Sequence, residues 1–247
     1  MRERRPTLDV SFDGVEVEAF GGESVLQCAR RHQIEIPSLC YLEGLSVWGG
    51  CRVCVVEVAE DPRPRPACAT PVTADMEVTT HSPRLKEYRK AIVELLFAEG
   101  NHVCAVCVSN GNCELQDVAV SVGMDHVRYE SRSPLRLIDA SHPKYLFDPN
   151  RCILCTRCVR VCDEIEGAHV WDIGSRGQHA VLTTDLNQPW GESSSCTWCG
   201  KCVAVCPTGS LSYQGSAVGE MQHHPDMIAR LATARREGEW IDPEELS

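Results

Sequence analysis

The chain has 247 residues, 16 of them cysteines, and a formal net charge of −11. This acidic charge argues against nucleic acid as a partner, because a phosphate backbone is itself negative. We see no signal peptide, and no apolar segment approaches the roughly 20 residues that a transmembrane segment needs. We therefore expect a soluble, cytoplasmic protein, in which clustered cysteines indicate metal binding in place of structural disulfides.

The first 80 residues predict a small mixed sheet packed on one helix. Residues 7–20 alternate apolar and polar positions about Asp13-Gly14, which is typical of a two-stranded hairpin. Ser24 is the expected N-cap of a short helix that ends before Pro37. The stretches RVCVVEV and MEVTT predict two further strands.

Four cysteines of this segment have the spacing C-x10-C-x2-C-x13-C. They are Cys40, Cys51, Cys54 and Cys68. Glycines in the same loop let backbone amides approach cluster sulfurs closely, which favours a two-iron (2Fe-2S) cluster. A zinc site is the alternative. Cys28 lies in the predicted helix, where an unliganded cysteine is expected to be a small buried hydrophobe.

Two helices are predicted in the next segment. Ser82-Pro83 indicates a helix start, and Gly100 indicates its end. The expected apolar face of this helix comprises Leu85, Tyr88, Ile92, Leu95 and Leu96. A second helix is expected from Glu114 to Val122, and residues 131–150, with three prolines, are expected to form a linker.

Between those helices lie three cysteines with the spacing C-x2-C-x5-C, namely Cys104, Cys107 and Cys113. A four-iron (4Fe-4S) cluster needs a fourth ligand, and His102 is the favoured candidate because imidazole nitrogen is a good iron ligand. Cys28 is the rival, although its helix belongs to another module. The histidines without neighbouring cysteine clusters are not expected to be cluster ligands; they include His81, His126, His142 and His169.

The pattern C-x2-C-x2-C-x3-C occurs twice between Tyr145 and Tyr213. In this bacterial ferredoxin pattern three close cysteines hold one cubane and the fourth reaches the other cluster. One 4Fe-4S cluster is therefore assigned to Cys152, Cys155, Cys158 and Cys206, and the other to Cys162, Cys196, Cys199 and Cys202. Zinc is the alternative, but zinc sites usually join two separated ligand pairs.

The segments between and after these two patterns also predict structure. The intervening stretch HVWDIGSRGQHAVLTT predicts a hairpin. Beyond residue 216, Met227, Ile228 and Leu231 share one helix side, which favours packing against the core or a partner.

Four motifs together carry a family resemblance: IPSLCYLEGLSVWGGCRVCVVEV, LLFAEGNHVCAVCVSNGNCELQ, RCILCTRCVRVCDEIEGAH and SCTWCGKCVAVCPTG. With them the chain resembles the HoxU-type iron-sulfur subunit in the diaphorase part of bidirectional, NAD-reducing nickel-iron hydrogenases. That subunit is similar to the N-terminal part of the large iron-sulfur subunit of complex I and of NAD-dependent formate dehydrogenases. In complex I relatives the histidine stands four residues before the first cysteine, where this chain has Gly100.

The resemblance implies an α+β chain with one 2Fe-2S and three 4Fe-4S clusters. It implies a β-grasp 2Fe-2S ferredoxin-like domain over residues 1–80 and a small helical His/Cys3 4Fe-4S domain over 81–140. A bacterial-type ferredoxin domain with two 4Fe-4S clusters is expected over 141–215, followed by a C-terminal tail with a helix over 216–247.

The expected function is an electron relay within a hydrogen:NAD+ oxidoreductase. The sequence has no dinucleotide-binding fingerprint and no Walker loop, so we expect no substrate-converting catalytic residue in this chain. NAD and FMN are expected only on a diaphorase partner subunit, and the small and large hydrogenase subunits are the other expected partners. The alternatives are the same role in an NAD-dependent formate dehydrogenase or a complex I-like assembly, and a zinc-stabilised scaffold.

Overall fold

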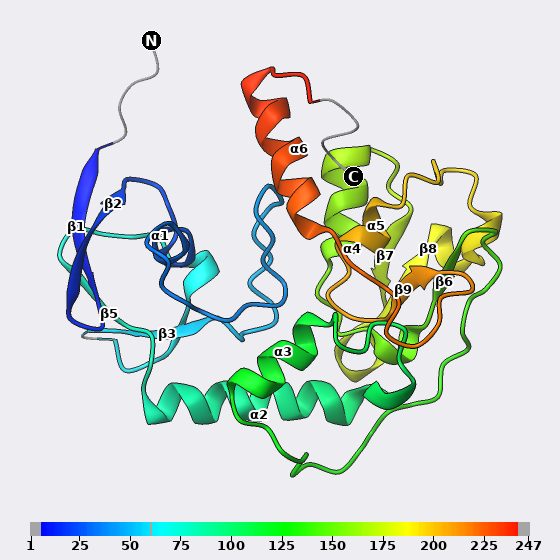
Figure 1. Ribbon diagram of the computed structural model, residues 1–247, viewed down its shortest axis with the longest axis horizontal. Helices are drawn as coiled ribbons and strands as arrows, with labels where there is room; N and C mark the ends of the chain where they lie inside the picture. The colour runs from blue at the N-terminus through cyan, green and yellow to red at the C-terminus, as the bar shows by residue number, and fades with distance from the viewer. Residues whose placement is uncertain (1–5, 60, 242–247) are drawn as a thin grey trace.

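The computed structural model describes residues 6–59 and 61–241. Its first region is a five-stranded mixed sheet covered by helix α1 (Val25–Arg31) (Figure 1). The strand order is β2-β1-β5-β3-β4, with β1 and β5 parallel and the other neighbours antiparallel. The strands are β1 (Thr7–Phe12), β2 (Val15–Phe20), β3 (Val55–Val58), β4 (Arg65–Pro66) and β5 (Met76–Thr79).

Local sequence signals in this region are confirmed. Asp13 and Gly14 connect β1 to β2 with φ angles of 49° and 84°, the left-handed pair that a two-residue hairpin turn requires. Ser24 and Gln27 form a reciprocal capping box at the start of α1. The predicted strand RVCVVEV is shorter than expected and begins only at Val55, because the residues before it belong to the loop that carries Cys51 and Cys54.

The second region contains two packed helices, α2 (Pro83–Glu99) and α3 (Glu114–Ser121). Ser82 caps α2 through its hydroxyl, which accepts from the Leu85 backbone N–H at 3.1 Å. The predicted apolar face is wrong in part, since Tyr88 and Leu95 are each 45% exposed.

Two charged side chains occupy the buried face of α2. Arg89 donates to the Val55 carbonyl at 2.7 Å, and the Glu94 carboxylate pairs with Arg128 at 2.8 Å. The ion pair with Arg128 offsets the desolvation of the Glu94 carboxylate. Arg89 is satisfied only in part, since its Nε has no hydrogen-bond partner among the described residues and burial lowers its pKa. The buried face of α2 therefore differs from the face that its apolar residues predicted, because tertiary contacts bury Arg89 and Glu94.

The third region repeats a short unit. Strand β6 (Tyr145–Phe147) pairs with β9 (Leu211–Tyr213), and the predicted hairpin is present as β7 (Trp171–Gly174) and β8 (Val181–Thr184). Each cysteine run leads into a short helix. These are α4 (Arg157–Arg160), which continues as a π-helical turn η4 (Val161–Glu166), and α5 (Lys201–Ala204).

Short 3-10 turns complete the regular structure of the described residues. They are η1 (Ala67–Ala69), η2 (Cys104–Val106), η3 (Pro149–Arg151), η5 (Gly177–His179), η6 (Asp185–Asn187) and η7 (Trp190–Glu192). The predicted linker over residues 131–150 is irregular only as far as residue 144, because β6 and η3 occupy its last part.

Helix α6 (Pro225–Glu237) packs against the rest of the molecule. Ile228 is fully buried in the core of the third region, which also takes in Leu42 and Leu45 from the N-terminal region. A Cβ at Gly44 would lie 2.5 Å from Ala232 Cβ, so the helix lies directly on that loop. The expectation of core packing for the tail is confirmed.

A separate hydrophobic core joins all three regions. It contains Leu39 and Cys40 from the first region, Leu115 from the second, and Ile153 and Cys155 from the third. Since predicted cluster ligands belong to this one core, the fold brings their sites close together. Among the described residues, no helix is both long enough and apolar enough to cross a membrane.

Candidate iron-sulfur centres

The four cysteines of the N-terminal region converge in one loop system. The Cys40 thiol lies beside those of Cys51 and Cys68, and the Cys54 thiol lies beside that of Cys68. These contacts lower the pKa of Cys40 and raise the pKa of Cys51 and of Cys68. Left-handed backbone at Arg52 (φ 59°) helps the loop to curl around the four sulfurs.

The second site is a cavity beside the start of α3. It holds about 310 Å³ of atom-free space, part of it open to solvent, and its lining includes His102, Cys104, Cys107 and Cys113. The Sγ atom of Cys113 lies 3.5 Å from the Pro207 carbonyl, so the third region forms one wall. The fold thus brings together all four side chains that the sequence assigned to this cluster.

His102 has the features of a ligand in this cavity. Its Nε2 is buried and has no hydrogen-bond partner among the described residues. Burial, with Arg151 nearby, lowers the pKa of His102 to about 4, so the ring is neutral near pH 7 and its free nitrogen can donate to a metal. A Cβ at Gly100 would lie 2.4 Å from Nε2, which shows that the imidazole occupies space that only glycine leaves open.

Two further cavities lie in the third region, and each is lined by one predicted set of four cysteines. One, of about 350 Å³, is lined by Cys152, Cys155, Cys158 and Cys206. The other, of about 330 Å³, is lined by Cys162, Cys196, Cys199 and Cys202. In both cavities the fourth cysteine of a run has crossed to the neighbouring site, as the ferredoxin pattern predicted.

Backbone geometry in these runs turns amides toward sulfur. Leu154 and Thr156 are left-handed, with φ angles of 52° and 60°. The Leu154 amide donates to Cys152 Sγ, and the Val170 amide donates to Cys162 Sγ, both at 3.4 Å. Such amide donors stabilise negative charge on cluster sulfurs.

The donor sets fit iron-sulfur clusters. Three cavities of similar size each present four soft or borderline donors, the ligand type that such clusters use. Across residues 6–59 and 61–241, no three His, Cys, Asp or Glu side chains are grouped closely enough to hold a single metal ion.

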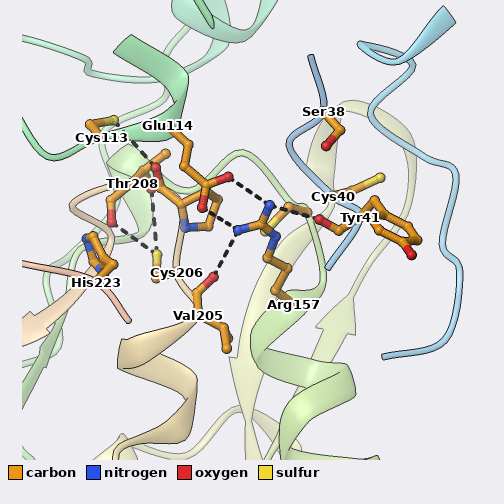
Figure 2. A network of polar contacts seen from close by, with 12 residues as sticks. Ser38, Cys40, Tyr41, Cys113, Glu114, Arg157, Val205, Cys206, Thr208 and His223 are labelled. Atoms are coloured by element: carbon orange, nitrogen blue, oxygen red, sulfur yellow. Dashed lines mark hydrogen bonds and ion pairs between the residues drawn. The ribbon is translucent and has the colours of Figure 1, made fainter. Parts of the chain in front are cut away.

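Two buried arginines on α4 were not predicted from the sequence. Arg157 extends from the third region toward Glu114, Tyr41 and Val205, and Figure 2 shows it between segments from all three regions. Arg160 reaches the carbonyl oxygens of Cys40 and Cys155. The available signal was the presence of two cations inside a cysteine run, T-R-C-V-R.

His142 is also closer to a cluster site than its sequence position suggested. The ring is buried, and its Nδ1 accepts from the backbone amides of Lys144 and Tyr145. The ring proton is therefore on Nε2, which lies 4.0 Å from Cys196 Sγ. The sequence predicted no role for His142 at a cluster site, because its sequence neighbours include no cysteine.

The other histidines named in the sequence, and Cys28, lie away from the four candidate sites. Three histidines lie on the surface beside carboxylates, namely His81, His126 and His169. Cys28 is fully buried in the hydrophobic core of the sheet, and burial raises the pKa of its thiol to about 12.

Comparison with known proteins yields three family models in chain order. Residues 5–83 match a 2Fe-2S iron-sulfur cluster binding domain, and residues 89–128 match the NADH-ubiquinone oxidoreductase-G iron-sulfur binding region. Residues 143–212 match the ferredoxin-like domain of NADH-quinone oxidoreductase subunit 3. The expected fold class, an α+β chain with 2Fe-2S and 4Fe-4S domains, is therefore confirmed.

One curated relative matches over most of both chains. The gamma subunit of the NAD-reducing hydrogenase HoxS from Cupriavidus necator is 33% identical over 206 residues, covering 83% of this chain and 86% of the relative. The chain belongs to the family of this HoxS gamma subunit. A chain from the structure of an NAD+-reducing NiFe-hydrogenase in the H2-reduced state agrees, with a TM-score of 0.81, 32% identity, and coverage of 94% of this chain and 99% of that one.

The chain also resembles segments of much longer proteins. The alpha subunit of NADPH-Fe(3+) oxidoreductase from Geobacter sulfurreducens is 37% identical over 204 residues. That match covers 83% of this chain and only 24% of the relative, so the chain spans about a quarter of that protein's length. The HndD subunit of an NADP-reducing hydrogenase from Solidesulfovibrio fructosivorans is 35% identical, covering 92% of this chain and 40% of the relative.

Proposed function

We propose that this chain is an electron-relay subunit of an NAD-reducing hydrogenase. The observation that carries the proposal is the assembly of sixteen side chains, fifteen cysteines and His102, into four sites that match the sequence-assigned ligand sets. The match to the HoxS gamma subunit over most of its length supports the same role. When bound, an iron-sulfur cluster supplies a one-electron redox centre.

We infer one 2Fe-2S cluster and three 4Fe-4S clusters. The proposed ligands of the first are Cys40, Cys51, Cys54 and Cys68. The proposed ligands of the others are His102, Cys104, Cys107 and Cys113; Cys152, Cys155, Cys158 and Cys206; and Cys162, Cys196, Cys199 and Cys202. The chain's role at these sites is to hold the ligands, exclude water and orient amide donors.

Packing supports electron transfer among these sites. Cys40 and Cys155 belong to one hydrophobic core, and Cys113 packs against it. A Cβ at Gly209 would lie 2.6 Å from Cys107 Sγ, so the His/Cys3 site directly adjoins the third region. Three of the four proposed sites are therefore separated from one another only by packed protein.

The proposed partners are a diaphorase subunit that carries FMN and NAD, and the small and large hydrogenase subunits, in the cytoplasm. No dinucleotide-binding fingerprint occurs in this sequence, which is consistent with hydride chemistry on another subunit. A complex I-like assembly or a formate dehydrogenase is the second candidate, because the family models that match residues 89–128 and 143–212 both describe parts of NADH-quinone or NADH-ubiquinone oxidoreductases.

Metal and sulfide analysis of the purified protein tests the relay proposal. We expect iron and acid-labile sulfide for all four clusters, with EPR signals on reduction. Replacing Cys54 with serine should diminish the 2Fe-2S signal, whereas Cys28→Ser, at the cysteine left without a cluster, should leave every EPR signal in place. Recovery of zinc without sulfide would refute the proposal in favour of a zinc-stabilised scaffold.

Co-purification from the native source tests the terminal enzyme. Hydrogenase subunits together with a flavoprotein should accompany the tagged chain. A formate dehydrogenase catalytic subunit in their place would support the second candidate.

A further inference from the structure

We propose that Arg160 raises the reduction potentials of the two clusters between which it lies, the 2Fe-2S cluster bound through Cys40 and the 4Fe-4S cluster bound through Cys155. The inference rests on the proposed function, since it concerns the same cluster sites. Arg160 is not itself a ligand, and its effect on the clusters is electrostatic.

The side chain of Arg160 joins two ligand segments directly. Its Nη2 donates to the Cys40 carbonyl at 2.6 Å and to the Cys155 carbonyl at 3.2 Å. Its Nη1 donates to the Ser46 carbonyl, and Nε lies 3.2 Å from the Thr156 hydroxyl. One guanidinium thus bridges residues that are distant in sequence and belong to different proposed clusters.

The charge of this guanidinium is buried and lacks a direct counter-ion. Arg160 is only 7% exposed, and within the described part of the chain no carboxylate oxygen lies within 4.0 Å of it. Glu164 is the carboxylate that interacts with it over a longer distance. That carboxylate is engaged by the Ser46 amide at 2.8 Å and by the Ser46 hydroxyl.

Arg157, one helical turn earlier, provides a contrast within the same helix. It is 2% exposed, but the Glu114 carboxylate accepts from both of its terminal nitrogens, at 2.6 and 2.8 Å. Figure 2 shows this two-point pairing, together with the contact of Arg157 to the Tyr41 carbonyl. The charge of Arg157 is therefore balanced locally, whereas that of Arg160 is not.

This difference has an electrostatic consequence. Reduction adds a negative charge to a cluster, and a nearby buried cation stabilises that charge more strongly than a solvated one would. A balanced ion pair has little net effect at the same distance. Arg160 therefore favours the reduced form of both neighbouring clusters, and Arg157 mainly holds the three regions together.

EPR-monitored redox titration of the purified complex tests the inference. Arg160→Gln removes the charge but keeps an amide donor for the carbonyl oxygens. We expect both midpoint potentials to fall by about 59 mV, which corresponds to a tenfold change in the ratio of oxidised to reduced cluster for a one-electron couple. Arg160→Lys, which keeps the charge, should restore most of the potential.

Glu114→Gln is the matched control. It removes the carboxylate that balances Arg157, so the potential of the same 4Fe-4S cluster, whose proposed ligands include both Cys155 and Cys206, should rise. Opposite shifts in the two variants cannot arise from a common loosening of the fold, which would move potentials through increased solvent access in both. Unchanged potentials in Arg160→Gln, with iron and sulfide retained, would overturn the inference.

If Arg160→Gln does not retain clusters, Arg160→Met decides the question, because it also removes the charge and keeps an unbranched side chain. Both midpoint potentials must fall in that variant, and absence of any fall overturns the inference. Iron and sulfide analysis of the unaltered protein is a separate measurement. Its failure would refute the relay proposal, whereas unchanged potentials in cluster-containing variants would refute only the role of Arg160.

Discussion

The His102 ring lies buried at the candidate cavity, in space that Gly100 leaves open because it has no Cβ. Its unpartnered Nε2 is the buried atom that a metal would satisfy. We expect His102→Cys to retain a 4Fe-4S cluster with a lower potential, because a thiolate replaces a neutral imidazole. His102→Ala should weaken or lose the cluster. EPR with iron analysis checks both variants, and an unchanged signal in the alanine variant would mean that another group supplies this ligand.

Gly100 also determines where the His102 imidazole can lie. Gly100→Ala should displace the imidazole, since the new Cβ would lie 2.4 Å from His102 Nε2. We therefore expect the same EPR signal to be lost or shifted. The matched control is Gly100→Ala combined with His102→Cys, whose shorter side chain relieves the clash. An unaltered signal in the single Gly100→Ala variant would contradict this account.

At the scale of elements, α6 fastens the N-terminal loop to the third region. Ile228 is fully buried between them, with Leu42 and Leu45 in the same core. Ile228→Ala should cost about 2–5 kcal/mol of stability, the usual range for such a truncation in a core. Hydrogen exchange of α6 amides and chemical denaturation measure this cost. Trp240→Ala, at a side chain that is 86% exposed, is the control and should change stability little.

The segment that leads into α6 also makes stability depend on pH. His223 lies 3.1 Å from the Ser109 hydroxyl and 3.0 Å from the Val203 carbonyl, and burial lowers its pKa. The unfolded chain therefore binds a proton at a higher pH than the folded chain does. This contribution to stability is complete above the unfolded pKa of about 6.5 and is lost as the pH falls below it.

Denaturation at pH 7.5 and 5.5 measures the effect of His223. The unaltered protein should lose more unfolding free energy over this interval than His223→Gln does. Equal losses in the two proteins would exclude His223 as a source of the pH dependence. Acid lability of the clusters affects both proteins alike and cancels in the comparison.

At the scale of the whole molecule, the regions differ in how much regular structure they have without metal. The N-terminal sheet has five strands and its own hydrophobic core. In the third region, β6 and β9 have three residues each, and β7 and β8 have four. The two proposed clusters would link its segments across long loops, and such links contribute to folding stability.

Removal of iron by a chelator tests this difference. Hydrogen-exchange protection should be lost first over residues 145–213 and be retained longest in β1, β2 and β5. Reconstitution with iron and sulfide should restore the lost protection. Equal loss in both regions would show that the sheet also depends on its cluster.

Local signals explain how much of the fold and the candidate sites was predictable. The Asp13-Gly14 turn, the Ser24 and Ser82 caps and the hairpin of β7 and β8 depend on residues a few positions apart. Cysteines of one cluster are likewise mostly neighbours in sequence, so their spacing reports the site. The buried face of α2 was predicted wrongly because Arg89 and Glu94 find their partners only in the folded molecule.

The sequence by itself determined the proposed ligand sets and the presence of 2Fe-2S and 4Fe-4S binding domains, because a cluster imposes short, recognisable spacings on its cysteines. Only the tertiary structure decided what surrounds them. Arg160 and Cys40 are 120 positions apart, and His142 and Cys196 are 54 apart, yet each pair is in contact. Contacts at such separations leave no periodic pattern in a sequence, and they arise here because three regions bury their apolar surfaces against one another.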